Sequence, residues 1–200
     1  MKISDIALLT VCGLEELGDH SARGVTHVLS ILDPEWAEPE TFTAYDSHTR
    51  ITLRFHDAIE PGPGVVLPEM ADVETILTFG QDVDASDGEH LLVHCHAGIS
   101  RSTAAMLMML VQSDPSQDED DIVERLRRIR PQAWPNSRMI DFADELLARD
   151  GRLSAAVGRL YAHRLAERPE LAEIMARLGR GREVAIAQRW LEAHPKDGRA

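Results

Sequence analysis

The sequence predicts an α/β fold, with a central, mostly parallel β-sheet flanked by helices and an extra helical extension at its C-terminal side. Three observations support this fold class. Short apolar runs typical of strands alternate with helical segments in the first half of the chain, whereas the second half has helical spacing throughout. The 200 residues are 44% hydrophobic, which is enough to bury the core of one domain.

Four runs rich in Val, Ile, Leu and Thr, each bounded by turn residues, are the expected strands. They are residues 5–13, 25–33, 49–57 and 89–95. The third run alternates apolar and polar residues, so we expect a half-buried strand there. After it come a Pro/Gly-rich loop over 59–68, a helix over 68–83 and a polar turn over 83–90.

The second half predicts helices with recognisable ends. Residues 102–112 are apolar almost all round, which indicates a buried helix. The helix over 121–130 closes with four arginines, which suit the C-terminal end of a helix dipole, and a proline follows it. Asn136 is a good N-cap for a helix over 137–150, and Gly151 ends that helix.

The charge is unevenly distributed along the chain. Residues 1–150 carry 11 basic and 28 acidic side chains, a net charge of −17, whereas residues 151–200 carry 10 and 6, a net charge of +4. We therefore expect a body over 1–150 and a helical extension over 151–200, with helix breaks near Pro169 and Gly181. The opposite charges favour an extension packed on the body over a separate protein-binding appendage.

The composition argues against several classes of protein. Two cysteines, Cys12 and Cys95, are too few for a disulfide scaffold or a structural zinc site. No apolar run approaches the ~20 residues that cross a bilayer, and the N-terminus lacks a signal-peptide pattern, so we expect a cytoplasmic protein without a membrane partner. The net charge of −13 and the 4% of aromatic residues argue against nucleic-acid binding.

The segment HCHAGISRS, residues 94–102, connects the fourth strand to the buried helix. Ligands of parallel sheets bind at the carboxyl ends of the strands, and Cys95 lies at such an end. We expect the backbone N–H groups from His96 through Arg101 to point inward, with the N-terminus of the helix behind them. This arrangement predicts an anion cradle, in which Gly98 supplies a tight turn with a positive φ.

Three side chains would allow the cradle to bind a phosphate group and react with it. Arg101 offers a planar fork suited to phosphate. Cys95 faces N–H donors and a guanidinium, which favour a thiolate in line with a bound phosphate. Ser102 can donate a hydrogen bond to the sulfur when it leaves. We expect inorganic phosphate or sulfate to bind in this loop, to the following residues: His96, Ala97, Gly98, Ile99, Ser100 and Arg101.

HCHAGISRS resembles the His-Cys-five-residues-Arg-Ser/Thr loop of the cysteine-dependent protein tyrosine phosphatases. The order of the elements resembles the compact dual-specificity branch in its bacterial form. RPQAWPN, residues 130–136, resembles an Arg-Pro…Pro-Asn stretch that is common in that branch. The resemblance covers roughly residues 1–150 and implies a phosphatase-like catalytic domain there.

The resemblance also implies a two-step mechanism that uses no cofactor and no metal. The cysteine attacks phosphorus, and an aspartic acid first protonates the leaving oxygen and then activates water. Asp57 matches that acid best, because it ends a strand, begins the Pro/Gly-rich loop and lies 38 residues before Cys95. Glu60 and Asp46 are the alternatives. His94 matches the family's histidine that supports the cysteine.

A phosphoprotein, dephosphorylated with tyrosine or dual specificity, is the favoured substrate. The loop has no lysine, which loops acting on inositol lipids usually carry, and the acidic body disfavours polyphosphorylated ligands. The same mechanism on a small-molecule, nucleotide or lipid phosphate is the alternative. A catalytically weak phosphate-binding module is an alternative of another class, against which the joint presence of Cys95, Arg101 and a plausible acid argues.

Simpler interpretations apply to several of these residues. Without Arg101 and Gly98, Cys95 would be an ordinary buried cysteine. Adjacent residues at a strand end point to opposite sides, which argues against a metal shared by His94, Cys95 and His96. For four residues we expect a plain role: His96 facing solvent, Asp33 as a turn residue, Asn136 as a helix cap and Cys12 in the core, with a reversible disulfide to Cys95 left open.

Overall fold

Four parallel strands form the sheet in the computed structural model, which describes residues 8–85 and 90–195. Their order is β1-β4-β2-β3, with bounds Leu8–Cys12 (β1), His27–Leu32 (β2), Thr49–Arg54 (β3) and His90–His94 (β4). All three neighbouring pairs are parallel, so the predicted α/β fold with a mostly parallel sheet is confirmed. Residues 5–7 of the first expected strand and 86–89 of the expected turn lie outside the described residues.

Side chains of the central strand β4 alternate between two layers. Leu91 and Val93 belong to the main core beneath the long helices, whereas Leu92 belongs to a smaller cluster on the other face. Its register partner Val28 on β2 lies in the same smaller cluster. Because helices cover both faces, every residue of β4 is buried, as is usual for parallel strands in the middle of a sheet.

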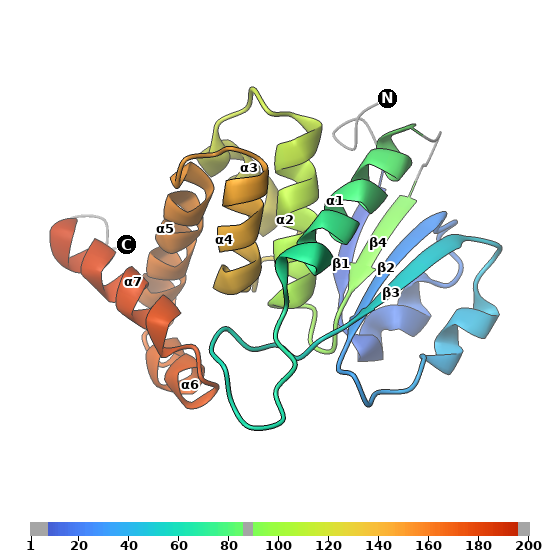
Figure 1. Ribbon diagram of the computed structural model, residues 1–200, viewed down its shortest axis with the longest axis horizontal. Helices are drawn as coiled ribbons and strands as arrows, with labels where there is room; N and C mark the ends of the chain where they lie inside the picture. The colour runs from blue at the N-terminus through green and yellow to red at the C-terminus, as the bar shows by residue number, and fades with distance from the viewer. Residues whose placement is uncertain (1–7, 86–89, 196–200) are drawn as a thin grey trace.

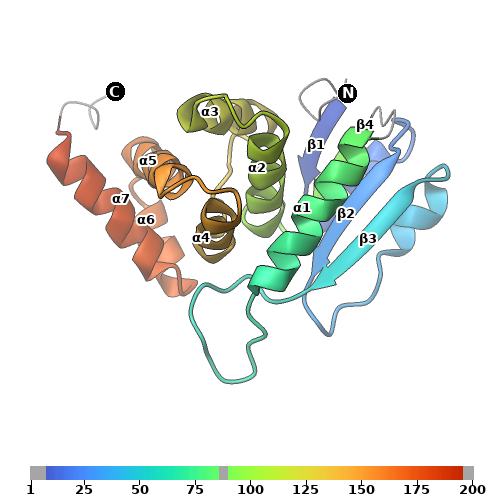
Figure 2. The ribbon, with the colours of Figure 1, turned by 45° about the horizontal axis from the view of Figure 1, so that its top comes forward.

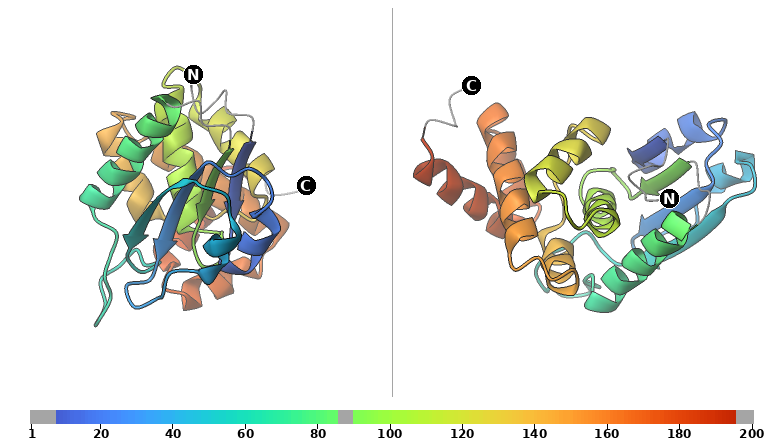
Figure 3. Two further views of the ribbon diagram at one scale, coloured as in Figure 1. Left: turned by 90° about the vertical axis from the view of Figure 1, so that its right-hand side faces the viewer. Right: turned by 90° about the horizontal axis from the view of Figure 1, so that it is seen from above.

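The helices differ in kind between the two faces (Figure 3). Two short 3-10 helices, Leu14–His20 (η2) and Glu40–Ala44 (η3), cover one face, and the longer helices lie on the other. These are Met70–Ala85 (α1), Arg101–Ser113 (α2), Glu119–Ile129 (α3), Ser137–Leu146 (α4), Arg152–Glu167 (α5), Leu171–Arg177 (α6) and Gly181–Ala193 (α7). The layers run from the sheet through α2 and α4 to α5 and α7 (Figure 1).

The position of helix α2 in the middle of the molecule explains its apolar composition. It packs against the sheet, α1, α3 and α4, and almost all of its residues are buried. A helix with neighbours on every side has no polar face, which is the predicted state of residues 102–112. The loop over residues 94–102 therefore leads into a helix that is buried on all sides.

The segment after residue 150 packs on the rest of the chain through α5. Leu153, Val157 and Leu160 are buried, and the Tyr161 ring stacks on Trp134 with ring centres 4.6 Å apart. Ion pairs add to these contacts, at Arg152–Glu119, Arg159–Asp120 and Arg182–Asp141. The division into 1–150 and 151–200 stays a prediction.

Helices α6 and α7 lie on the side of the molecule opposite β3, and the loop between β3 and α1 extends toward them (Figure 2). Breaks at 168–170 and 178–180 separate the three last helices, close to the expected Pro169 and Gly181. Within 8–85 and 90–195, no helix has both the length and the apolar character needed to cross a membrane.

Candidate active site

Cys95 follows the last residue of β4 at the carboxyl end of the sheet, and its side chain is 2% exposed. Six residues later, Arg101 begins α2. The Cys95 Sγ lies 3.2 Å from the Ser102 Oγ, within hydrogen-bonding distance for sulfur. The thiol and a hydroxyl from the first turn of α2 are therefore already in contact.

The backbone of the loop is turned so that its carbonyl groups face outward. Each carbonyl accepts a hydrogen bond from outside the loop: His96 from Leu14 N (2.9 Å), Ala97 from Arg130 Nη2 (3.1 Å), Gly98 from Arg130 Nε (2.9 Å), Ile99 from Trp134 N (2.9 Å) and Ser100 from Asn136 N (3.3 Å). The described peptide bonds are trans, so each following N–H points the opposite way. The N–H groups of residues 97–101 consequently converge on the interior of the loop.

Arg130 holds two of these carbonyls and is itself held by Glu16. Its Nη1 and Nη2 each donate to one Glu16 carboxylate oxygen at 2.7 Å. Glu16 also accepts from Gly13 N at 2.6 Å. The hydrogen bond from Arg130 is the main cause that lowers the pKa of Glu16, so the pair stays charged at neutral pH. Arg130 is the first residue of the RPQAWPN stretch, for which the sequence suggested no individual role.

Gly98 has φ +67°, the predicted positive value. A Cβ on Gly98 would lie 2.4 Å from the carbonyl carbon of Cys12 and 2.6 Å from Gly13 N. The end of β1 therefore presses directly on the loop, and only glycine satisfies both the dihedral angle and the space.

Cys12 lies behind the loop as a buried, free cysteine, in keeping with its expected place in the core. Burial, and then the nearby Glu16 carboxylate, raise the pKa of Cys12 to about 12. Its thiol is therefore protonated at neutral pH.

Arg101 is 3% exposed, and its orientation is set by two acceptors. Its Nη1 donates to Asp33 Oδ1 at 2.7 Å and to the Phe55 carbonyl at 2.6 Å. The Arg101 Nε is buried and donates to no acceptor within the described ranges. Asp33, expected to be a plain turn residue after β2, therefore also positions the arginine of the loop, a role that its sequence context did not indicate.

The two histidines beside Cys95 have different environments. His94 is fully buried, and its Nε2 lies 2.7 Å from Ser30 Oγ. Burial is the main cause that lowers the pKa of His94 to about 4, so the ring is neutral at physiological pH. The expectation that His96 faces solvent holds for only part of its side chain, which is 24% exposed. Its ring packs at a tilt against Trp36 and accepts a hydrogen bond from Asp33 N at 3.2 Å.

Asp57 lies three residues beyond β3 and faces the loop. Its Oδ1 accepts from three groups: Ser100 Oγ at 2.7 Å, Asn136 Nδ2 at 3.0 Å and Arg180 Nη1 at 2.8 Å. Burial raises the pKa of Asp57, but the charges of Arg180 and Arg101 and the donors on Asn136 and Ser100 outweigh it. The pKa of Asp57 is therefore lower than usual.

The alternative acids are less favourably placed. Asp46 precedes β3 and thus lies near the amino end of that strand, whereas the loop is at the carboxyl end of the sheet. Glu60 lies six residues beyond β3, whereas Asp57, three residues beyond it, accepts a hydrogen bond from Ser100 of the loop. Asp57 remains the proposed acid.

Sequence reasoning missed two further neighbours of Asp57. Asn136 caps α4 as expected, with its Oδ1 accepting from Arg138 N and Met139 N, but its amide nitrogen also reaches Asp57. The RPQAWPN resemblance could have indicated this residue. Arg180 lies 123 residues from Asp57, and no local pattern connects them.

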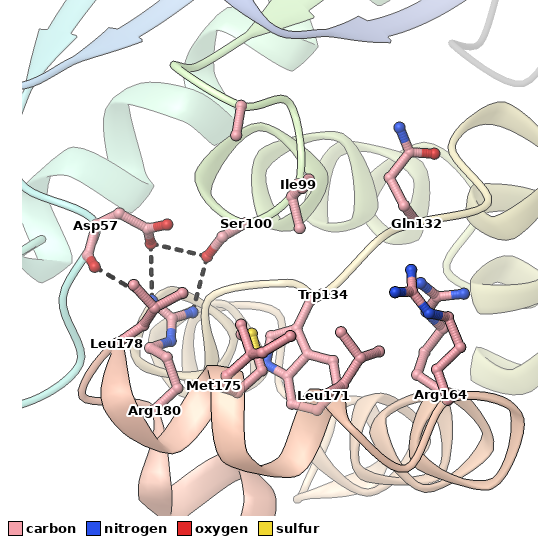
Figure 4. A pocket seen from close by; sticks show the side chains of 13 residues that line it. Asp57, Ile99, Ser100, Gln132, Trp134, Arg164, Leu171, Met175, Leu178 and Arg180 are labelled. Atoms are coloured by element: carbon pink, nitrogen blue, oxygen red, sulfur yellow. Dashed lines mark hydrogen bonds and ion pairs between the residues drawn. The ribbon is translucent and has the colours of Figure 1, made fainter.

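A cavity of about 380 Å³ lies between the loop and α6 (Figure 4). Asp57, Ala97, Ile99 and Ser100 line one side. The other side is mostly apolar and consists of Trp134, Leu171, Ile174, Met175 and Leu178, with Gln132, Arg164, Arg168 and Arg180 at its edges.

Residues 64–149, which include the loop, match the family model described as protein-tyrosine phosphatase. Over these residues the chain resembles the cysteine-dependent protein tyrosine phosphatases, as the loop motif indicated. It is accordingly a cysteine-dependent phosphatase, as the resemblance implied. No curated protein matches the sequence of this phosphatase closely enough to count as a relative.

Solved structures share the fold of this phosphatase at low sequence identity. Human DUSP28 is 16% identical with a TM-score of 0.53, and the match covers 70% of this chain and 94% of that chain. DUSP15 is 22% identical with a TM-score of 0.53, and the match covers 76% and 91%. The human tyrosine phosphatase-like serine/threonine/tyrosine-interacting protein is 20% identical with a TM-score of 0.51, over 70% and 87%.

Proposed function

We propose that this phosphatase hydrolyses phosphomonoesters through a phosphocysteine at Cys95, with Asp57 as the acid and base. In the first step, the Cys95 thiolate forms an S–P bond while the ester P–O bond breaks, and Asp57 gives its proton to the leaving oxygen. In the second step, water attacks phosphorus and loses a proton to the Asp57 carboxylate, and the P–S bond breaks to restore the thiolate.

The convergence of the loop N–H groups above Cys95 is the observation that carries this proposal. Five carbonyls bound from outside hold the loop open before substrate arrives, so the donors need no reorganisation when charge develops on phosphorus. Arg101, with its buried Nε, adds a charged donor, and the Ser102 hydroxyl stabilises the thiolate as it leaves. His94 contributes as a neutral support behind the cysteine.

The cavity beside the loop favours a phosphoprotein with an aromatic leaving group, such as phosphotyrosine. An apolar wall that begins at Ile99 and continues through Trp134 and Met175 suits a flat ring next to the phosphate. The same wall is ill suited to a polyhydroxylated inositol headgroup. The side chains of phosphoserine and phosphothreonine are shorter and have no ring to contact this wall. We therefore expect them to react more slowly than phosphotyrosine.

The first experiment measures metal-free hydrolysis of p-nitrophenyl phosphate as a pH–rate profile for the wild type and Cys95→Ser. We expect a bell that is absent in the variant, while the variant still binds inorganic phosphate in calorimetry. A wild type that binds phosphate but shows no turnover would instead indicate a binding module. Turnover by Cys95→Ser would exclude the phosphocysteine.

The second experiment tests Asp57 through the leaving group. General acids contribute about 10²–10⁴-fold, and mainly where the leaving oxygen is basic. Asp57→Ala should therefore lose roughly that factor on phenyl phosphate and much less on p-nitrophenyl phosphate. Glu60→Ala is the control, and equal losses on both substrates in Asp57→Ala would place the acid elsewhere.

A panel of phosphotyrosine, phosphoserine and phosphothreonine peptides, compared with nucleoside monophosphates, separates the protein substrates from the small-molecule alternative. A preference for the nucleotides would overturn the phosphoprotein assignment and leave the mechanism standing. We propose the cytoplasm as the compartment, where glutathione keeps thiols such as Cys95 reduced.

A further inference from the structure

Arg180 brings the C-terminal extension into the active site. It stands immediately before α7, and its side chain is 3% exposed. Its Nη1 donates to Asp57 Oδ1 at 2.8 Å and to the Asp57 carbonyl at 3.3 Å, and its Nη2 donates to Ser100 Oγ at 2.7 Å (Figure 4). One guanidinium thus connects the proposed acid to the last residue of the loop before Arg101.

Glu183 holds the other edge of the same guanidinium. The fully buried Glu183 accepts from Arg180 Nε at 2.9 Å, from Trp134 Nε1 at 2.5 Å and from Ser137 N at 2.8 Å. These donors come from the residue before α7 and from the segment that leads into α4, so Glu183 ties the extension to the wall of the site. Acceptors on both edges therefore fix the plane of the Arg180 guanidinium, whereas a surface ion pair would leave that plane free to rotate.

Two charged groups and one titratable histidine lie near Asp57. Arg180 from the extension and Arg101 from α2 both favour the carboxylate, and His96 lies nearby on the loop. Arg101 is already held by Asp33, whereas Arg180 makes the direct 2.8 Å contact with Asp57. The extension therefore supplies Arg180, the cation that is hydrogen-bonded to the proposed acid.

We propose that Arg180 is a positioning residue for Asp57, so that the extension completes the catalytic apparatus. The inference rests on the proposed function, because it assigns Arg180 to the acid and base of that mechanism. Arg180 aims the Asp57 carboxyl at the leaving oxygen in the first step. In the second step the same contact favours the carboxylate form, which accepts the proton from water.

The charge of Arg180 has a predictable effect on the pH dependence. Asp57 must carry a proton when the first step begins, so kcat/KM falls as pH rises through the pKa of this carboxyl. Because Arg180 lowers the pKa of Asp57, it moves that alkaline limb to lower pH. Removal of the charge should return the limb to higher pH.

The test compares Arg180→Met and Arg180→Lys with Arg182→Met as the matched control. Arg182 lies two residues further along, and it joins α7 to Asp141 and Ser137 without contact to Asp57. For Arg180→Met we expect an alkaline limb at higher pH and about a tenfold or larger loss of kcat on phenyl phosphate. Arg180→Lys keeps the charge but not the planar fork, so its limb should stay close to that of the wild type while kcat still falls.

A double variant distinguishes positioning from a purely structural role. With Asp57→Asn already present, Arg180→Met should cost less than about twofold, because coupled residues are not additive. An equal loss in both backgrounds, with an unmoved alkaline limb, would overturn the positioning role and leave the proposed function intact. A wild type without turnover would overturn the proposed function and this role together. If loss of the Arg180 charge beside the buried Glu183 prevents Arg180→Met from folding, Arg180→Lys decides by its loss on phenyl phosphate relative to p-nitrophenyl phosphate.

Discussion

At Gly98 two independent constraints act on one residue. The positive φ costs a residue with a side chain about 1–2 kcal/mol, and the backbone of Cys12 and Gly13 leaves no room for a Cβ. The first constraint affects stability alone, whereas the second displaces the loop. A substitution at Gly98 therefore tests how large a displacement of the loop backbone the activity tolerates.

We expect Gly98→Ala to lower activity on p-nitrophenyl phosphate by about 100-fold, because displacements near 1 Å cost catalysis that much. Gly24→Ala is the control, since Gly24 has φ +63° and a Cβ added there would meet no atom of a non-neighbouring residue within 4 Å. It should lose a similar amount of stability through strain and keep full activity. The measurements are thermal unfolding and kcat/KM, and equal activities of the two variants would show that the loop tolerates the shift.

Residues of the loop could be predicted because they are consecutive. Nine neighbouring residues between a strand and a helix specify the cradle, its glycine and its position at the end of the sheet. Asp33 and Arg130 also contact the loop, but each approaches it from a distant segment, and the sequence shows only a turn residue and a helix end at these positions. Their roles depend on tertiary contacts that periodicity does not encode.

At the scale of single elements, the N-terminus of α4 combines two tasks in Asn136. The side-chain oxygen caps the helix, and the amide nitrogen donates to Asp57. The cap was predictable, because N-cap residues have a local signature. The donor was not, because it joins Asn136 to a residue 79 positions away.

We expect Asn136→Ser to separate these tasks, since serine caps as well as asparagine but has no amide nitrogen. Asn136→Ser should be about 1 kcal/mol more stable than Asn136→Ala in urea unfolding. Both variants should lose about tenfold or more in kcat on phenyl phosphate, where the acid matters most. Asp118→Ser changes the cap of α3 away from the site and should keep its activity.

Full activity of Asn136→Ser on phenyl phosphate would show that Asn136 serves α4 alone. In that case, the contacts from Ser100 and Arg180 would be enough to orient Asp57.

At the scale of the whole molecule, the extension and the body share one core. Leu153, Tyr161 and Val184 belong to the same buried cluster as the sheet residues Leu29 and Val93. The sequence indicated docking through opposite charge. The structure shows that burial of apolar side chains and the Glu183 contacts join the two parts as well.

We therefore expect one cooperative unfolding transition in urea. Tryptophan fluorescence, far-UV circular dichroism and residual activity should have the same midpoint, as two-state unfolding requires. Trp190 in α7 and Trp36 near the loop place fluorescence probes in the extension and beside the candidate active site. A fluorescence transition at lower urea, with activity retained, would mean that the extension detaches without harm to the site.

The contact between Asp57 and Arg180 also has a consequence for the order of events on the ribosome. The two residues are 123 positions apart, and synthesis at about 5–20 residues per second separates their appearance by roughly 6–25 seconds. The phosphate loop emerges within that interval. The residues of the anion cradle are therefore synthesised before the last helices, and Asp57 gains its contact with Arg180 only when those helices follow.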